Sequence, residues 1–151
     1  MRAVVQRVAW ARVVVQDEVV GEIERGLLVY LGVGRDDTDR DRAYLLRKVV
    51  GLRVFPDEAG KMTRSVLDVS GQILIVSQFT LYADVRKGQR PSFDDAMPAA
   101  LANAVYESFV QEARALAPVS TGKFGADMKV TSLNDGPITI TIDSAISPRP
   151  S

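Results

Sequence analysis

The chain has 151 residues, of which 46% are hydrophobic and 25% are charged, values typical of one globular domain. Its 19 Lys and Arg residues balance 19 Asp and Glu residues, which argues against nucleic-acid binding by bulk charge but permits a small basic patch. Cysteine and histidine are both absent, which excludes disulfides, thiolate nucleophiles, imidazole bases and metal sites built on these residues. We expect no metal and no cofactor, although a magnesium site made of carboxylates alone is possible in principle.

Apolar runs in the first half of the chain predict a sheet interrupted by one helix. Thr38, followed by Asp41 three residues later, resembles a capping box and predicts a helix that runs to about Val50 and ends at Gly51. Runs rich in β-branched residues, bounded by glycines and polar turns, predict strands over residues 2–15, 19–23, 27–34, 52–55, 65–69 and 73–76.

The second half predicts one more helix and two more strands. Asp94 or Asp95 is expected to cap a helix that has Pro98 in its first turn and stops before Pro118. Its predicted buried stripe consists of Leu101, Val105, Phe109, Ala113 and Leu116. A loop over 119–127, strands over 128–133 and 138–142, and a frayed tail over 146–151 complete the chain.

These elements predict an α+β fold in which a curved, barrel-like mixed β-sheet carries two main helices packed on it. We expect one domain over residues 1–145. No apolar run is long enough to cross a bilayer and no leader pattern is visible, so the default expectation is a cytoplasmic protein without a membrane partner.

The predicted strand over 73–76 changes abruptly from apolar to polar at Ser77 and Gln78, and Thr80 follows closely. A buried strand that ends in hydroxyl and amide side chains is a natural floor for a pocket. The alternative is a strand end whose polar side chains bond only to the local backbone. Three cations follow in the loop over 84–93, which predicts either a solvated loop or a phosphate contact through Arg86, Lys87 and Arg90.

A second polar stretch, residues 134–137, joins the last two predicted strands and has the composition of a hairpin turn. A cis bond before Pro137 would cost only about 0.5–1 kcal/mol relative to trans. It would point the carbonyls of Gly136 and Pro137 in similar directions, as a rigid pair of acceptors for an ammonium group. Arg7 lies among apolar neighbours and is interpreted, from strand alternation alone, as an outward-facing arginine.

Six segments together resemble the D-aminoacyl-tRNA deacylase family, and the resemblance extends over the chain to about Asp143. Two departures from the family pattern, Thr63 in place of Asn and Met97 in place of Ala, lie outside its two signature motifs. The matching segments are MRAVVQRV (1–8), GKM (60–62), SQFTLYA (77–83), KGQRPSF (87–93), FGADM (124–128) and NDGP (134–137).

The resemblance implies an enzyme that hydrolyses the ester between a D-amino acid and the terminal adenosine of tRNA, and that also accepts glycine. It implies a homodimer in which the cis Gly136-Pro137 motif enters the partner's pocket, holds the substrate's amino group and rejects L side chains. Arg7 would brace this motif, and Phe124 and Met128 would border the adenosine.

The resemblance also implies the facing wall of the pocket, made of Ser77, Gln78, Phe79 and Thr80. The backbone N–H groups of Phe79 and Thr80 would polarise the ester carbonyl. Without His or Cys, Thr80 and Ser77 have no obvious base nearby, and the family suggests that the ribose 2′-OH of the tRNA assists instead.

Two other classes of protein remain open: a non-catalytic small RNA-binding module that uses the cations of the 84–93 loop, and a structural oligomeric barrel without a ligand. Zero net charge and the lack of an aromatic cluster beside that loop count against the first. The second leaves the polar strand end, Arg7 and the Gly136-Pro137 pair unexplained.

Overall fold

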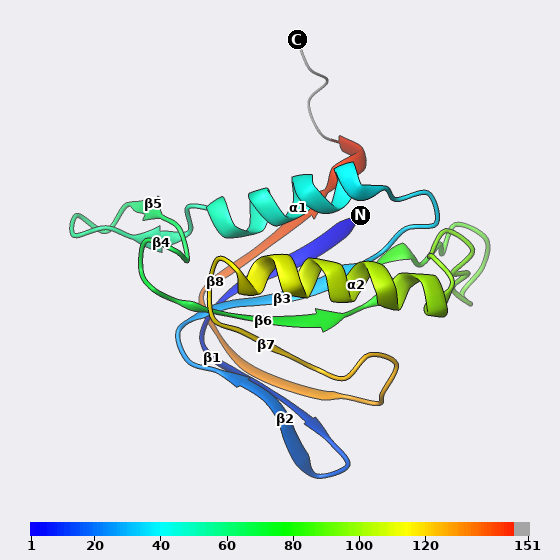
Figure 1. Ribbon diagram of the computed structural model, residues 1–151, viewed down its shortest axis with the longest axis horizontal. Helices are drawn as coiled ribbons and strands as arrows, with labels where there is room; N and C mark the ends of the chain where they lie inside the picture. Colours follow the sequence, from blue (N-terminus) through cyan, green and yellow to red (C-terminus); the bar gives the residue numbers. More distant parts are fainter. Residues whose placement is uncertain (147–151) are drawn as a thin grey trace.

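A six-stranded mixed sheet forms the body of the protein, of which the computed structural model describes residues 1–146 (Figure 1). A separate two-stranded sheet, β4 (Phe55–Pro56) with β5 (Met62–Arg64), projects to one side. The strands of the main sheet are β1 (Arg2–Val15), β2 (Glu18–Ile23), β3 (Gly26–Gly32), β6 (Gln72–Ser77), β7 (Val119–Thr121) and β8 (Lys129–Asp143).

The parallel pair β3 and β6 lies at the centre of this sheet and is buried on both faces. Successive side chains of a strand point to opposite faces, so two cores form. Leu27 and Ile73 face a core shared with the helices, whereas Leu28 and Leu74 face a second core inside the curve of the sheet. This double burial explains why both strands are continuous apolar runs.

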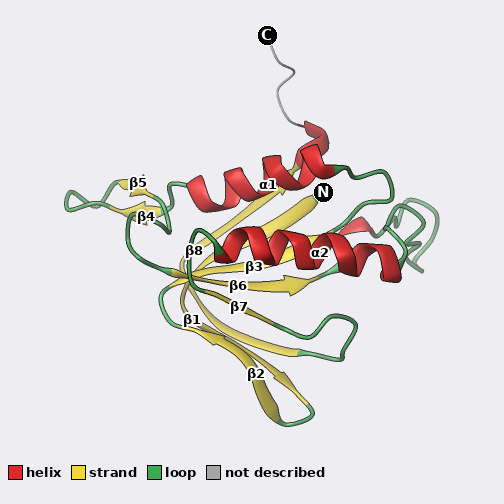
Figure 2. Ribbon diagram, in the orientation of Figure 1, coloured by secondary structure: helices red, strands yellow, loops and turns green. Residues whose placement is uncertain are grey.

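The length of β1 allows the sheet to curl into a nearly closed barrel (Figure 2). Its first half pairs with β3, its second half pairs with β2, and both halves pair with β8, all antiparallel. The Ser120 hydroxyl of β7 donates to the Glu22 carbonyl of β2 at 3.0 Å, which brings the two ends of the sheet together. The predicted barrel-like α+β architecture with two main helices is therefore confirmed.

Helices α1 (Asp39–Gly51) and α2 (Ala99–Arg114) cover one face of the sheet side by side, as Figure 2 shows. The predicted capping box is present, since Asp41 accepts a hydrogen bond from the Thr38 backbone N–H at 2.8 Å. Arg42 joins the helices through Glu112 at 3.0 Å. Among the described residues, no helix has the length and apolarity needed to span a bilayer.

Two predicted strands are wrong, each because side chains occupy the backbone groups that a ladder needs. Residues 65–69 form a turn: the Ser65 N–H donates to the Asp68 carboxylate at 2.8 Å, and the Asp68 N–H donates to the Ser65 hydroxyl at 3.2 Å. In the stretch 52–55 only Phe55 pairs in a strand, because the Val54 carbonyl accepts from Arg7 instead.

The second helix begins later and packs on a different stripe than predicted. It starts at Ala99 with Pro98 as its N-cap, so neither Asp94 nor Asp95 caps it. Leu101 is 63% exposed and Leu116 is 50% exposed and lies beyond the helix. The buried face consists of Ala102, Tyr106, Phe109, Val110 and Ala113. The predicted stripe did not include Tyr106.

The last two predicted strands are one strand, β8, and residues 134–137 are not a hairpin turn. Both halves of β8 pair with β1, and the register shifts between the pairs Gln6–Thr139 and Val8–Asn134, so that the intervening residues bulge out. Part of the expected 119–127 loop is strand β7. Of the expected tail, Ile146 ends the short 3-10 helix η2 (Ser144–Ile146), and 147–151 lie outside the described residues.

Candidate active site

A pocket of about 550 Å³ opens beside the end of β6 and the start of α2. Ser77, Gln78 and Phe79 line it, together with Phe124 and Met128. The structure therefore brings together five of the nine predicted site residues, from stretches nearly fifty positions apart in the chain. Thr80, Arg7, Gly136 and Pro137 do not line this pocket.

The polar end of β6 is held in place by its neighbour β3. The Gln78 N–H donates to the Leu31 carbonyl at 2.8 Å, which continues the strand pairing one residue past Ser77. The chain then turns into the short 3-10 helix η1 (Phe79–Tyr82). The abrupt change from apolar to polar residues thus coincides with the point where the buried strand reaches the pocket.

The start of η1 presents two backbone donors without an acceptor in the described part of the chain. Within residues 1–146, neither the Phe79 N–H nor the Thr80 N–H donates to a protein acceptor. The first N–H groups of a helix have no partner inside the helix, so such donors are available to an oxygen of a ligand. A pair of this kind beside a pocket can stabilise negative charge that develops on a carbonyl oxygen.

The Thr80 hydroxyl is exposed, and its partner is the Gln78 side-chain amide rather than a base. No carboxylate or lysine bonds to Thr80 or Ser77 within the part of the chain that the structure describes. Residues 1–146 contain no cluster of three or more acidic side chains able to hold a metal ion. The pocket therefore offers positioning groups and backbone donors, without an activated protein nucleophile.

Phe124 is held against the helix layer and Met128 against the barrel. The Phe124 ring lies 5.7 Å from the Tyr106 ring, and burial raises the pKa of the Tyr106 hydroxyl, which donates to the Ile75 carbonyl at 2.8 Å. Met128 occupies the space that a side chain at Gly122 would need, since a Cβ there would lie 2.5 Å from its sulfur. The two residues supply apolar surface to the pocket that Phe79 also lines.

Arg7 holds the 134–137 bulge and does not face solvent, so the outward-facing interpretation is wrong. Its side chain is 13% exposed and donates to the Val54 carbonyl at 2.7 Å and the Asp135 carbonyl at 3.1 Å. A Cβ at Gly136 would lie 3.1 Å from its guanidinium. The bond from Gly136 to Pro137 is cis, and both residues are exposed on the same bulge.

The basic loop is closed by mutual backbone bonds between Asp84 and Ser92 at 2.8 and 2.9 Å. Arg86 bonds to Asp84 through two nitrogens, and these bonds lower the pKa of Asp84 to about 2. Arg86 is thereby neutralised, and only Lys87 and Arg90 of its three cations lack a salt bridge within residues 1–146.

Sequence analysis missed the wall of the pocket that comes from the segment before α2. Met97 and Pro98 line the pocket, and the Met97 N–H donates to the Val33 carbonyl at 3.0 Å. Phe93 packs edge-on against Phe79, with ring centroids 4.9 Å apart. The only local signal was the apolar Phe93 at the end of a basic loop, because the long-range pairing that brings it to Phe79 leaves no pattern in the sequence.

Comparison with known proteins identifies close relatives along almost the whole chain. The family model described as D-Tyr-tRNA(Tyr) deacylase matches residues 4–143. A D-aminoacyl-tRNA deacylase of Thermotoga petrophila is 56% identical over 146 residues, which cover 96% of this chain and 98% of the relative. One from Roseiflexus sp. (strain RS-1) is 54% identical over 151 residues, covering 99% and 97%.

A solved structure with the same fold bears a different description. The c-Myc DNA Unwinding Element Binding Protein superimposes with a TM-score of 0.91 at 44% sequence identity, covering 99% of this chain and 100% of that one. The barrel, both helices and the strand order are therefore shared across proteins that carry different names.

Proposed function

Since the chain belongs to the D-Tyr-tRNA(Tyr) deacylase family, we propose that it hydrolyses the ester bond that joins a D-amino acid to the terminal adenosine of a tRNA. Glycine, which has no side chain to exclude, is proposed as a second substrate group when it is charged on a tRNA such as that for alanine. The products are the free amino acid and the tRNA.

The observation that carries this proposal is the meeting of Ser77, Gln78 and Phe79 with Phe124 and Met128 in one pocket. The apolar pair offers a surface on which an adenine can stack. The N–H groups of Phe79 and Thr80 have no acceptor within residues 1–146, and at the start of η1 beside the pocket they would donate to the ester oxygen as it becomes negative.

Nucleophilic attack is proposed to rely on water assisted by the ribose 2′-OH of the substrate. The support is the chemistry of the pocket, since Thr80 bonds to an amide and no base adjoins it within residues 1–146. The protein would then contribute orientation and charge stabilisation, which together account for many powers of ten in rate.

Selection against L-amino acids is assigned in this proposal to Gly136 and Pro137 of a partner subunit in a homodimer. Within one chain the Gly136–Pro137 bulge does not line the pocket, so a second copy is needed to bring the two together. Phe79 at the pocket is 55% exposed and Leu101 on α2 is 63% exposed, apolar surface that a partner subunit would cover. A rigid backbone excludes a misplaced side chain more strongly than an apolar cavity does.

The dimer is tested by sedimentation equilibrium at the protein concentration of the activity assay. We expect twice the chain mass of 16.5 kDa. A chain that is monomeric there and fully active would refute the cross-subunit site while leaving the hydrolase itself intact.

The proposed function is tested with matched D-tyrosyl-tRNA and L-tyrosyl-tRNA. We expect the protein to hydrolyse the D ester and spare the L ester. Pro137→Ala is expected to lower the ratio of D-ester to L-ester hydrolysis rates at least about tenfold, or about 1.4 kcal/mol, because alanine allows the backbone at Gly136 and residue 137 to move.

Pro118→Ala is the matched control for the Pro137 variant. Pro118 follows α2, does not line the pocket and uses only its carbonyl, which alanine retains. If the purified protein leaves both esters intact, the catalytic proposal fails, and a non-catalytic RNA-binding role becomes the better account of the same surface.

A further inference from the structure

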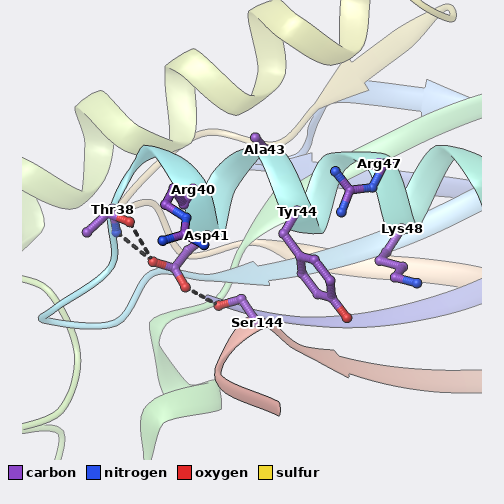
Figure 3. A pocket seen from close by; sticks show the side chains of 8 residues that line it. All are labelled: Thr38, Arg40, Asp41, Ala43, Tyr44, Arg47, Lys48 and Ser144. Carbon is purple, nitrogen blue, oxygen red and sulfur yellow. Dashed lines mark hydrogen bonds between the residues drawn. The ribbon is translucent and has the colours of Figure 1, made fainter. Parts of the chain in front are cut away.

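A basic groove of about 620 Å³ runs along α1 (Figure 3) and shares no lining residue with the candidate active-site pocket. Among residues 1–146, its cations are Arg40, Arg47 and Lys48, and its only carboxylate is Asp41. Three positive charges against one negative charge leave the groove with a net charge of +2, on a chain whose net charge is zero. Such a local excess is what phosphate binding requires.

The cations of this groove are exposed and unpaired, unlike their neighbour on the same helix. Arg42 bonds to Asp39 at 2.6 Å and to Glu112 at 3.0 Å, where it joins the two helices. Among residues 1–146, Arg40, Arg47 and Lys48 form no salt bridge and donate no hydrogen bond to protein. These three cations therefore do not stabilise the fold through ion pairs and are available to bind a ligand.

The one carboxylate in the groove is already engaged by the protein, as the dashed lines in Figure 3 show. Asp41 accepts from the Thr38 backbone at 2.8 Å and from the Ser144 hydroxyl at 2.7 Å. Burial acts to raise the pKa of Asp41, but the bonds from Thr38 and Ser144 outweigh it and lower the pKa. Asp41 therefore stays charged while its oxygens bond to protein donors, so it competes only weakly for the cations.

The spacing of the cations suits a nucleic-acid strand. Arg40, Tyr44, Arg47 and Lys48 lie on successive turns of one helix face, and both Arg47 and Lys48 lie 5.6 Å from the Tyr44 ring. The eight helix steps from Arg40 to Lys48 cover about 12 Å along one face, so the cations can lie beside neighbouring phosphates of one strand.

The groove and the pocket are joined through the segments that precede the two helices. The Arg35 N–H donates to the Asp95 carbonyl at 2.8 Å, and the Met97 N–H donates to the Val33 carbonyl at 3.0 Å. Both helices consequently begin at the same end of the molecule (Figure 1). We propose that the α1 groove binds the phosphate backbone of the tRNA whose aminoacylated 3′ end occupies the pocket. This inference rests on the proposed function.

The test compares two double variants, each of which removes two positive charges. Arg47→Gln with Lys48→Gln removes two of the three groove cations, and Arg53→Gln with Arg114→Gln removes two exposed cations elsewhere. Glutamine retains helix propensity, so α1 is kept. The readouts are kcat/KM for D-tyrosyl-tRNA, kcat/KM for D-tyrosyl-adenosine, which lacks the phosphate backbone, and the salt dependence of uncharged tRNA binding.

We expect the groove variant to lose about tenfold in kcat/KM on the tRNA ester and to lower the log–log salt slope by about 2, one unit for each lost phosphate contact. Its activity on the adenosine ester should match that of the control variant. If the two variants lower kcat/KM on the tRNA ester equally, or if the groove variant loses equally on both esters, the proposal that the groove binds tRNA is refuted. If the unmodified protein cleaves neither ester, the proposed function fails. The salt slope for uncharged tRNA then still shows whether the groove binds phosphates.

Discussion

Gly26→Ala is expected to lower the free energy of unfolding by more than about 4 kcal/mol, the range reserved for severe steric or packing defects. A Cβ at this position would lie 1.8 Å from the Gln72 carbonyl oxygen and 2.7 Å from the Gln72 carbonyl carbon. These are backbone atoms of the neighbouring strand, so no side-chain rotation relieves the clash. Urea unfolding followed by circular dichroism measures the loss.

The clash would also disturb the pocket, because Gly26 pairs with Gln72 at the start of β6 and Ser77, which lines the pocket, lies at the end of β6. Gly51→Ala is the matched control: nothing lies within 4 Å of its Cβ position, at the end of α1. That substitution should leave stability unchanged or raise it by up to about 1 kcal/mol. If the free energy of unfolding of the Gly26→Ala protein lies within about 1 kcal/mol of the parent value, the close approach of β3 and β6 is contradicted.

Phe79→Pro is expected to reduce kcat by about 10²- to 10³-fold below Phe79→Ala, the typical cost of one lost oxyanion donor. Both variants lack the aromatic ring, and only proline also lacks the backbone N–H. Proline is tolerated at the first position of a helix, which Phe79 occupies in η1. Single-turnover hydrolysis of a D-aminoacyl-tRNA isolates the chemical step.

Equal rates for the Phe79→Pro and Phe79→Ala proteins would remove this N–H from the mechanism. Thr80→Ala completes the series, since it keeps both N–H groups and deletes only the hydroxyl. We expect a modest loss, because that hydroxyl bonds to the Gln78 amide and has no base. A loss on the order of 10⁴-fold or more, as for a deleted nucleophile, would instead make Thr80 the attacking group and refute assistance by the ribose.

Local patterns predicted those elements whose own residues supply the driving force. The two apolar runs became the doubly buried strands β3 and β6, and the capping box of Thr38 and Asp41 became the start of α1. The prediction failed where a side chain competed for backbone groups, as Asp68 does in the 65–69 turn. It also failed for Tyr106, a core residue because its buried hydroxyl reaches the Ile75 carbonyl.

By itself, the sequence determined the family, the barrel-like α+β class and the polar end of β6, because these depend on periodicity and on short contiguous motifs. Only the tertiary structure decided that residues 134–137 form a bulge in a continuous strand, since a turn and a bulge use the same residues and differ in their pairing with β1. It alone brought Phe124 and Met128 into one pocket with Phe79, and left Arg40, Arg47 and Lys48 without a salt bridge within residues 1–146, on the helix where Arg42 is paired. Long-range pairing, which leaves no local signal, is the physical reason in each case.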